Sequence, residues 1–115
     1  MTLADRKCVP CRGGVPPLET PIARKLLEEL GPGWQLTHGT KRLEKTYKFG
    51  EFADALRFVN RVGEIAEKED HHPDLRFGWG YCTLEIWSHK IDGLTESDFY
   101  LAAKADREYR PPPAA

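Results

Sequence analysis

Histidine and glutamate side chains gather in the second half of this 115-residue sequence with a spacing that suits proton transfer. Glu67 precedes His71 by four residues, His72 and Pro73 follow directly, and His89 comes later in the chain. Residues four apart on a helix lie on one face, so we expect Glu67 to stack with His71 near a helix end. Histidine exchanges protons near neutral pH, which is what general acid–base catalysis requires.

Two other interpretations of these histidines stand beside the catalytic one. Histidines near the C-terminus of a helix are common stabilising caps, and spacing alone gives the cap and the catalytic site equal weight. A zinc site is disfavoured, because the adjacent His71 and His72 would rarely point at one ion and no second cluster completes a tetrahedron. The sequence therefore leaves a stabilising helix cap and a proton-transfer site open for these histidines, and it disfavours a metal site.

Three further features qualify as candidates. The indole rings of Trp79 and Trp87 are suited to stacking on a flat heterocycle or to filling an oligomer interface. Asp98 follows Thr95 by three residues, so a helix-capping role is preferred to a catalytic one. Cys8-x-x-Cys11 is half of a zinc knuckle without the second pair, and we interpret it as two exposed thiols in a loose arm.

The helices and strands that position these residues can be predicted from the spacing of apolar residues and from the glycine and proline residues between them. Residues 1–18 and 110–115 are rich in proline and lack periodicity, so we expect an irregular arm and a disordered tail around a domain of residues 19–109. Within it we expect helices over 20–30, 52–70 and from 95 onward, and strands over 34–37, 43–49, 74–79 and 81–88. Thr20 and Pro21 suit a helix N-cap and first turn.

The order α-β-β-α-β-β-α predicts an α+β fold, a four-stranded antiparallel sheet with three helices on one face. Cys82, Leu84 and Ile86 alternate along the last strand and form its expected core face. The helix over 52–70 has an apolar stripe wider than one sheet face requires, which indicates self-association. Its apolar residues are Phe52, Ala55, Leu56, Phe58, Val59, Val62, Ile65 and Ala66.

Composition bounds the function classes. Seventeen Lys and Arg against eighteen Asp and Glu give a net charge of −1, which offers no general electrostatic case for nucleic acid or an anionic membrane. No apolar run approaches the roughly 18 residues of a membrane span, and the N-terminus lacks a signal-peptide core. Three cysteines are too few for a disulfide scaffold. We expect a small, reduced, cytoplasmic domain.

The ordered set Glu67-x-x-x-His71-His72-Pro73, Trp79, His89 and Asp98 resembles the signature of the pterin-4a-carbinolamine dehydratases. The similarity covers about residues 20–107 and leaves the arm and the tail outside. It implies the same α+β fold, with sheets paired edge to edge into homodimers and often homotetramers through helices.

The resemblance also implies dehydration of 4a-hydroxytetrahydropterin to quinonoid dihydropterin, which recycles the cofactor of aromatic amino acid hydroxylases. No metal or organic cofactor is implied. By position, His71, His72 and His89 match the catalytic histidines and Glu67 matches the carboxylate of the pterin site; Trp79 and Trp87 are the further candidates for substrate binding. The sequence does not assign the acid and the base.

Some residues depart from the family pattern. Lys90 replaces an acidic residue that many dehydratases carry after the third histidine, and Phe77-Gly78-Trp79-Gly80 replaces a more polar strand. The arm and residues 87–91 resemble a bacterial subgroup, some of whose relatives act as Rubisco assembly factors of the carboxysome, while other members of the wider family are dimerisation cofactors of a transcription factor. The alternative function is therefore a non-catalytic protein that binds Rubisco or another protein.

Overall fold

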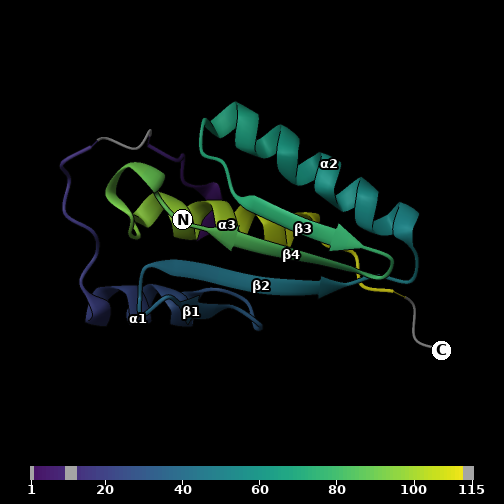
Figure 1. The fold of residues 1–115 in the computed structure, drawn as a ribbon, viewed down its shortest axis with the longest axis horizontal. Coiled ribbons are helices and arrows are strands. Elements are labelled where there is room, and N and C mark those ends of the chain that lie inside the picture. Colours follow the sequence, from purple (N-terminus) through teal and green to yellow (C-terminus); the bar gives the residue numbers. More distant parts are fainter. Residues whose placement is uncertain (1, 10–12, 113–115) are drawn as a thin grey trace.

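The computed structural model describes residues 2–9 and 13–112. The order of elements confirms the predicted α-β-β-α-β-β-α arrangement (Figure 1). The elements are α1 (Thr20–Glu29), β1 (Gln35–Thr37), β2 (Arg42–Lys48), α2 (Phe52–Glu69), β3 (Asp74–Gly78), β4 (Tyr81–Ile86) and α3 (Glu96–Glu108), with 3-10 turns at Leu3–Asp5 and His89–Ile91. The four strands form one antiparallel sheet in the order β1-β2-β4-β3, so β3 and β1 are its edges.

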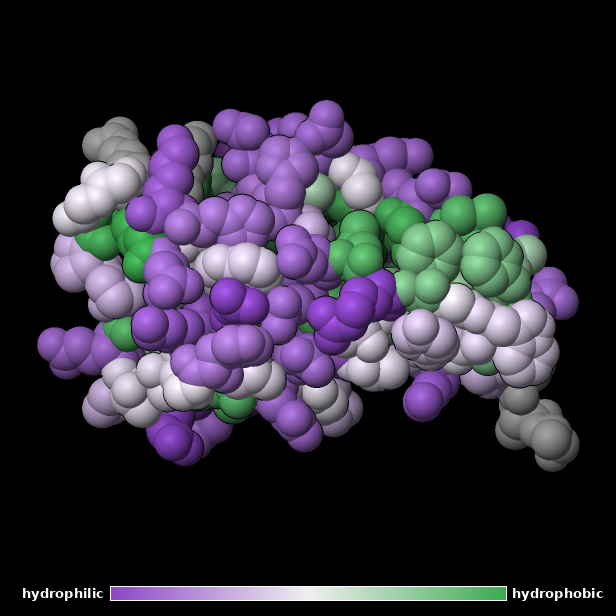
Figure 2. Space-filling view, in the orientation of Figure 1, coloured by the Kyte–Doolittle hydropathy of each residue, from purple (hydrophilic) through white to green (hydrophobic). Residues whose placement is uncertain are grey.

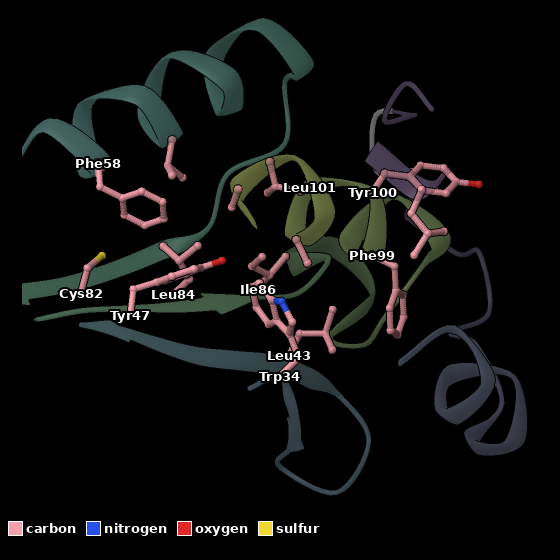
Figure 3. Close-up of a cluster of buried hydrophobic side chains, with 14 of the residues drawn as sticks. Trp34, Leu43, Tyr47, Phe58, Cys82, Leu84, Ile86, Phe99, Tyr100 and Leu101 are labelled. Atoms are coloured by element: carbon pink, nitrogen blue, oxygen red, sulfur yellow. The ribbon is translucent and has the colours of Figure 1, made fainter. Parts of the chain in front are cut away.

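The hydrophobic core lies between the sheet and the helices. Side chains that alternate along the two central strands, among them Leu43 and Tyr47 of β2, point toward Phe58 of α2 and Phe99 and Leu101 of α3 (Figure 3). The predicted core face of β4 is confirmed, because Cys82, Leu84 and Ile86 are fully buried. Burial raises the pKa of the Cys82 thiol to about 11, which makes it an inert part of this core.

Helix starts differ in how well local signals predicted them. The capping box of α3 is confirmed, with Thr95 at the N-cap and its backbone N–H donating to Asp98 Oδ2 at 2.8 Å. For α1 the prediction of Thr20 as the N-cap is wrong, since Glu19 takes that position and Thr20 is the first helical residue. The Thr20 hydroxyl instead lies 3.1 Å from that of Thr40, a tertiary contact between α1 and the loop after β1.

The β3–β4 hairpin is shorter than its predicted strands. Gly78 pairs with Tyr81, so Trp79 and Gly80 form the turn, and Gly80 has a φ of +83° that favours glycine. At the other end β4 stops at Ile86, and Ser88 makes an isolated bridge with Gly93. The strand is therefore two residues shorter than the predicted range of 81–88, and His89 begins a 3-10 turn.

The N-terminal segment contains a feature that its proline-rich composition concealed. Leu3 and Ala4 are buried against the domain, and the Lys104 ammonium donates to the Ala4 carbonyl at 2.8 Å. Arg107 of α3 donates to the Asp5 carboxylate at 2.6 Å. This hydrogen bond, together with those from Thr2, holds the pKa of Asp5 well below its usual range. Residues 2–9 thus pack on α3, whereas Cys11 and residues 113–115 lie outside the described residues.

Among the helices of the described chain, none is long and apolar enough to cross a membrane.

Candidate active site

The end of α2 turns two adjacent histidines in opposite directions. Asp70 takes a left-handed conformation with a φ of +51°, and the His71 N–H donates back to the Ala66 carbonyl at 3.1 Å. This is the hydrogen-bond pattern of a Schellman-type helix end, with aspartate where glycine is more usual. Because the chain reverses at Asp70, the His71 side chain is buried and that of His72 is exposed.

His71 belongs to a closed polar network. The exposure of His71 is 5%, and its Nε2 lies 2.5 Å from Oδ1 of Asp98, whose exposure is 0%. The other carboxylate oxygen of Asp98 accepts from the Ser88 hydroxyl at 2.9 Å and from the backbone N–H of Thr95 at 2.8 Å. Buried polar atoms need such partners, so Asp98 unites the end of α2, the segment after β4 and the start of α3.

Asp98 therefore has two roles, of which sequence reasoning preferred only one. Its capping role is present, as predicted from the three-residue spacing to Thr95. Its contact with His71 joins residues 27 apart in the chain, and no local pattern encodes such a contact. The available signal was the position of Asp98 in the motif that includes the three histidines.

His72 forms the exposed half of the site. Its Nε2 lies 2.5 Å from Oε2 of Glu67, so the glutamate contacts His72 and the predicted stack of Glu67 on His71 is wrong. The reason is the reversal at Asp70, which takes His71 off the helix surface and places the next residue beside Glu67. With Nε2 held by the carboxylate, Nδ1 of His72 is the nitrogen left for a ligand.

His89 lies at the same end of the sheet. Asp74 of β3 pairs with Glu85 of β4. The residues before Asp74 and those after β4 therefore leave the sheet at the same end. His89 is exposed and directly follows Ser88, whose hydroxyl donates to the carboxylate that holds His71. One buried aspartate therefore anchors both segments that carry the histidines.

The Trp87 ring is flanked by two other groups. Its centroid lies 4.3 Å from that of the His89 imidazole, and the Arg42 guanidinium carbon lies 4.0 Å from the Trp87 ring centroid. Glu85 is 3.4 Å from Arg42 and orients it. Trp87 thus supports His89 with much of its own surface covered.

Trp79 is not with the histidines of its own chain. It lies in the β3–β4 turn with 73% of its surface exposed, at the far end of β3 from His72. The five residues of β3 span about 13 Å at roughly 3.3 Å per residue step. The structure therefore gathers His71, His72 and His89 with Glu67 and Trp87, and it leaves Trp79 apart.

Residues of the N-terminal segment form hydrogen bonds to the helix ends beside the site, and the sequence did not predict them. The backbone N–H of Cys8 donates to Oε1 of Glu69 at 3.0 Å, and that of Val9 donates to the Ser97 hydroxyl at 2.7 Å. Glu69 ends α2 and Ser97 lies in the first turn of α3, so this segment joins the two helix ends that supply His71 and Asp98. The hydrogen bond from Cys8 and the charge of Lys104 lower the pKa of Glu69.

The prediction of an exposed Cys8 thiol is wrong. Cys8 is buried, and burial together with the nearby Glu69 carboxylate raises the pKa of its thiol to about 12. Such a thiol stays protonated and unreactive at neutral pH. Across residues 2–9 and 13–112, no group of three or more His, Cys, Asp and Glu side chains is placed to hold a metal ion.

Comparison with known proteins finds relatives that match most of the chain. A protein of Rickettsia bellii (strain OSU 85-389) is 54% identical over 105 residues, which is 91% of this chain and 92% of the relative. A protein of Rubrobacter xylanophilus is 52% identical over 91% of this chain and 96% of its own length. Both carry the provisional name pterin-4-alpha-carbinolamine dehydratase. A match of 105 residues cannot fit within residues 16–115, so it reaches into the N-terminal segment.

Two solved structures share the fold. The crystal structure of a transcriptional coactivator/pterin dehydratase from Brucella melitensis superposes with a TM-score of 0.75 at 28% identity, over 80% of this chain and 97% of that one. A pterin dehydratase-like protein identified as a RuBisCO assembly factor in the alpha-carboxysome gives a TM-score of 0.58 at 23% identity, over 66% of this chain and 88% of that one. The second likeness is one of fold alone.

The model of one protein family, described as pterin 4 alpha carbinolamine dehydratase, matches residues 16–108 and so includes every histidine and carboxylate of the site. The chain belongs to the pterin-4a-carbinolamine dehydratase family.

Proposed function

We propose that this protein dehydrates 4a-hydroxytetrahydropterin to quinonoid dihydropterin. The observation that carries the proposal is the exposed His72–Glu67 pair, fixed beside the buried His71–Asp98 pair at the end of the sheet where His89 also lies. Two exposed imidazoles on separate segments can face one substrate from two directions. That is the arrangement needed when one proton is given and another is taken.

The reaction breaks the C4a–O bond and forms a C=N bond. The leaving hydroxyl takes a proton and departs as water, while a ring nitrogen loses a proton and its electron pair forms the double bond. His72, oriented by Glu67, and His89, supported by Trp87, are the groups exposed for these two transfers. Which of them is acid and which is base is left open by their geometry.

His71 is proposed to act through the position of its neighbours. Its Nε2 contacts Asp98 and its ring is buried, so it has little surface to offer to a substrate. The contact instead fixes the backbone from which the His72 side chain projects. We therefore place His72 and His89 at the substrate and His71 behind them.

The decisive test is the dehydration rate of wild type and His72→Ala with 4a-hydroxytetrahydropterin. Removal of a general acid or base lowers the rate by about 10²–10⁴-fold. Glu67→Gln should lower it less, because the histidine is kept and loses only its ionic partner. Lys68→Ala, an exposed change on the next residue of α2, is the matched control and should retain the wild-type rate. A wild-type rate equal to the uncatalysed background would refute the proposal.

The family resemblance also supports self-association into homodimers or homotetramers, and a cytoplasmic location. Phe52 and Leu56 of α2 belong to the apolar stripe predicted from the sequence, yet they are 45% and 39% exposed in the single chain. Apolar side chains left exposed on a small domain favour burial against another copy.

Binding of Rubisco or another protein without turnover is the alternative function. The departures at Lys90 and at residues 77–80 motivate it, and Lys90 is exposed beside His89. The likeness to the RuBisCO assembly factor concerns the fold, so the intact histidine set favours the enzyme. Co-purification with Rubisco, together with a wild-type protein that lacks dehydratase activity, would reverse this preference.

A further inference from the structure

Glu69 of α2 links the N-terminal segment to the residue at which the chain reverses. Its Oε1 accepts the backbone N–H of Cys8 at 3.0 Å and lies 3.6 Å from the Lys104 ammonium. The next residue is Asp70, whose left-handed backbone conformation is less favourable than it would be for glycine. A backbone in such a conformation persists where the surrounding structure holds it. The contact with Cys8 fixes the residue directly before the reversal and so contributes to that hold.

Ser97 of α3 makes a second link from the same segment to the site. Its hydroxyl accepts the Val9 N–H at 2.7 Å and lies 3.3 Å from the Val9 carbonyl, and its own carbonyl lies 3.5 Å from the Cys8 sulfur. Ser97 is buried, and a buried hydroxyl needs such partners. The next residue is Asp98, which holds His71. The segment thus contacts the residue directly before each of the two aspartates that shape the site.

The segment is also anchored away from these two contacts. Leu3 and Ala4 are buried against the domain. The Lys104 ammonium donates to the Ala4 carbonyl at 2.8 Å. Arg107 of the same helix donates to the Asp5 carboxylate at 2.6 Å. A chain that is held at both ends of such a short stretch can resist movement of the helix ends that it contacts.

We propose that residues 3–9 act as a clamp that positions His72 for the dehydration, with Glu69 and Ser97 as the positioning residues through which the clamp acts. The inference rests on the proposed function for the identity of the reaction. The family model matches residues 16–108, so the clamp lies outside the part of the chain that this model describes.

The clamp lies at the histidine end of the sheet, where it contacts the ends of α2 and α3. Figure 2 shows hydrophobic residues gathered elsewhere, by the β3–β4 hairpin and the start of α2. Exposed apolar side chains are the ones that favour burial against another copy. Loss of the clamp should therefore change the site and leave self-association as it is.

A movement of the helix ends would reach His72 over a short stretch of chain. His72 is three residues after Glu69, and the contact with Asp98 holds the residue directly before it. A misplacement of about 1 Å can lower the rate of a reaction by about 10²-fold. Such a misplacement removes no contact with bound substrate, so the loss should fall on kcat and leave KM unchanged.

Substitutions of Glu69 separate its hydrogen bond from its charge. Glu69→Ala removes the acceptor of the Cys8 N–H, whereas Glu69→Gln keeps a carbonyl oxygen at that place. We expect Glu69→Ala to lower kcat by about 10- to 100-fold at an unchanged KM, and Glu69→Gln to stay within about threefold of wild type. Glu64→Ala changes an exposed glutamate of the same helix, so it is the matched control and should keep the wild-type kcat.

Substitutions of Val9 test the clamp from the segment itself and leave every residue of the site in place. Val9→Pro removes the N–H that donates to Ser97, and Val9→Ala keeps that N–H while it removes an exposed side chain. Val9→Pro should lower kcat by about tenfold, and Val9→Ala should match wild type.

All variants are assayed at a temperature at which circular dichroism shows them fully folded. A segment that only stabilises the fold would lower the Tm of Val9→Pro and Glu69→Ala and leave the kcat of the folded protein unchanged. That result would overturn the proposal, as would a rise in KM at an unchanged kcat.

An NMR measurement distinguishes failure of the clamp from failure of the proposed function. If wild type does not accelerate the dehydration, the proposed function fails, and the clamp is judged by the backbone amide and imidazole signals of His71 and His72. Val9→Pro should shift these signals although they are far from Val9 in the sequence, and Val9→Ala should leave them at their wild-type positions. Unchanged signals in Val9→Pro refute the clamp whether or not the protein is active.

Discussion

The two ends of β3 differ in how their side chains are covered: one is closed by polar contacts within the chain, and the other leaves apolar side chains exposed. At the histidine end, Asp98 contacts His71, Ser88 and Thr95, and the N-terminal residues pack on the helix ends, so this buried carboxylate has its partners within one chain. At the hairpin end, Trp79, Phe52 and Leu56 are exposed, and within residues 2–9 and 13–112 no strand pairs with the outer side of β3. The first end fixes the geometry of the site, and the second leaves apolar side chains exposed. A domain of this size divides these tasks along a single strand.

The largest effect on stability should come from breaking the histidine end of β3, called the closed end below because Asp98 joins its segments. Asp98→Ala removes the acceptor of His71, Ser88 and the N-terminal N–H of α3 at once, so we expect a loss of about 3 kcal/mol in the free energy of unfolding. Urea denaturation measures it. Ser88→Ala removes one of these contacts and should cost about 1 kcal/mol. A loss below that for Asp98→Ala would contradict the view that this carboxylate holds the segments together.

The stability of the protein should depend on protein concentration if the hairpin end of β3, called the open end here, is covered by a partner. If its apolar residues are covered by a second copy, each tenfold rise in concentration stabilises the folded dimer by about 1.4 kcal/mol, and the Tm rises accordingly. Leu56→Ser should abolish this dependence and give a monomer in sedimentation analysis. Ser97→Ala, at the closed end, is the control that should keep the concentration dependence. A wild-type Tm independent of concentration would show that the hairpin end needs no partner.

Acid should loosen the closed end first. The pKa of Glu69 is lowered from its ordinary value of 4.5 by the Cys8 N–H and Lys104. Its stabilisation is therefore fully present above that value and is lost as the pH falls through the lower folded-state pKa. Glu69→Gln should cost about 1 kcal/mol at neutral pH and progressively less in acid. Unfolding measured across this pH range tests the sign, and a gap between the two proteins that widens in acid would contradict it.

The smallest effect on stability should come from His72. It is exposed and its partner Glu67 is exposed too, so His72→Ala should change the free energy of unfolding by no more than about 0.5 kcal/mol while the dehydration rate falls. His71→Ala, in contrast, leaves the buried Asp98 carboxylate without a partner and should destabilise the fold strongly. Parallel measurement of stability and rate on the two variants sharpens the division between neighbouring residues.

The sequence predicted what local patterns encode. Alternation identified Cys82, Leu84 and Ile86 as core, and the Thr95–Asp98 spacing identified the start of α3, because both depend on residues a few positions apart. The order of elements followed from the same signals. These are the levels at which propensity and period agree with the final fold.

The rest depends on contacts between distant segments. Nothing near Glu67 indicates that the chain reverses at Asp70, a non-glycine residue in a left-handed conformation, and this reversal decides which histidine the glutamate meets. The docking of Cys8 on Glu69 joins residues 61 apart, and proline-rich composition gave no sign of it. The separation of Trp79 from His72 requires the strand register, which spacing in a motif does not provide.

The double use of Asp98 also joins a local contact to a distant one. Its contact with Thr95 spans three residues and belongs to the first turn of α3. Its contact with His71 closes a loop of 27 residues, which costs more chain entropy. The two contacts of Asp98 therefore differ in the loop that each must close, and the site depends on the longer one.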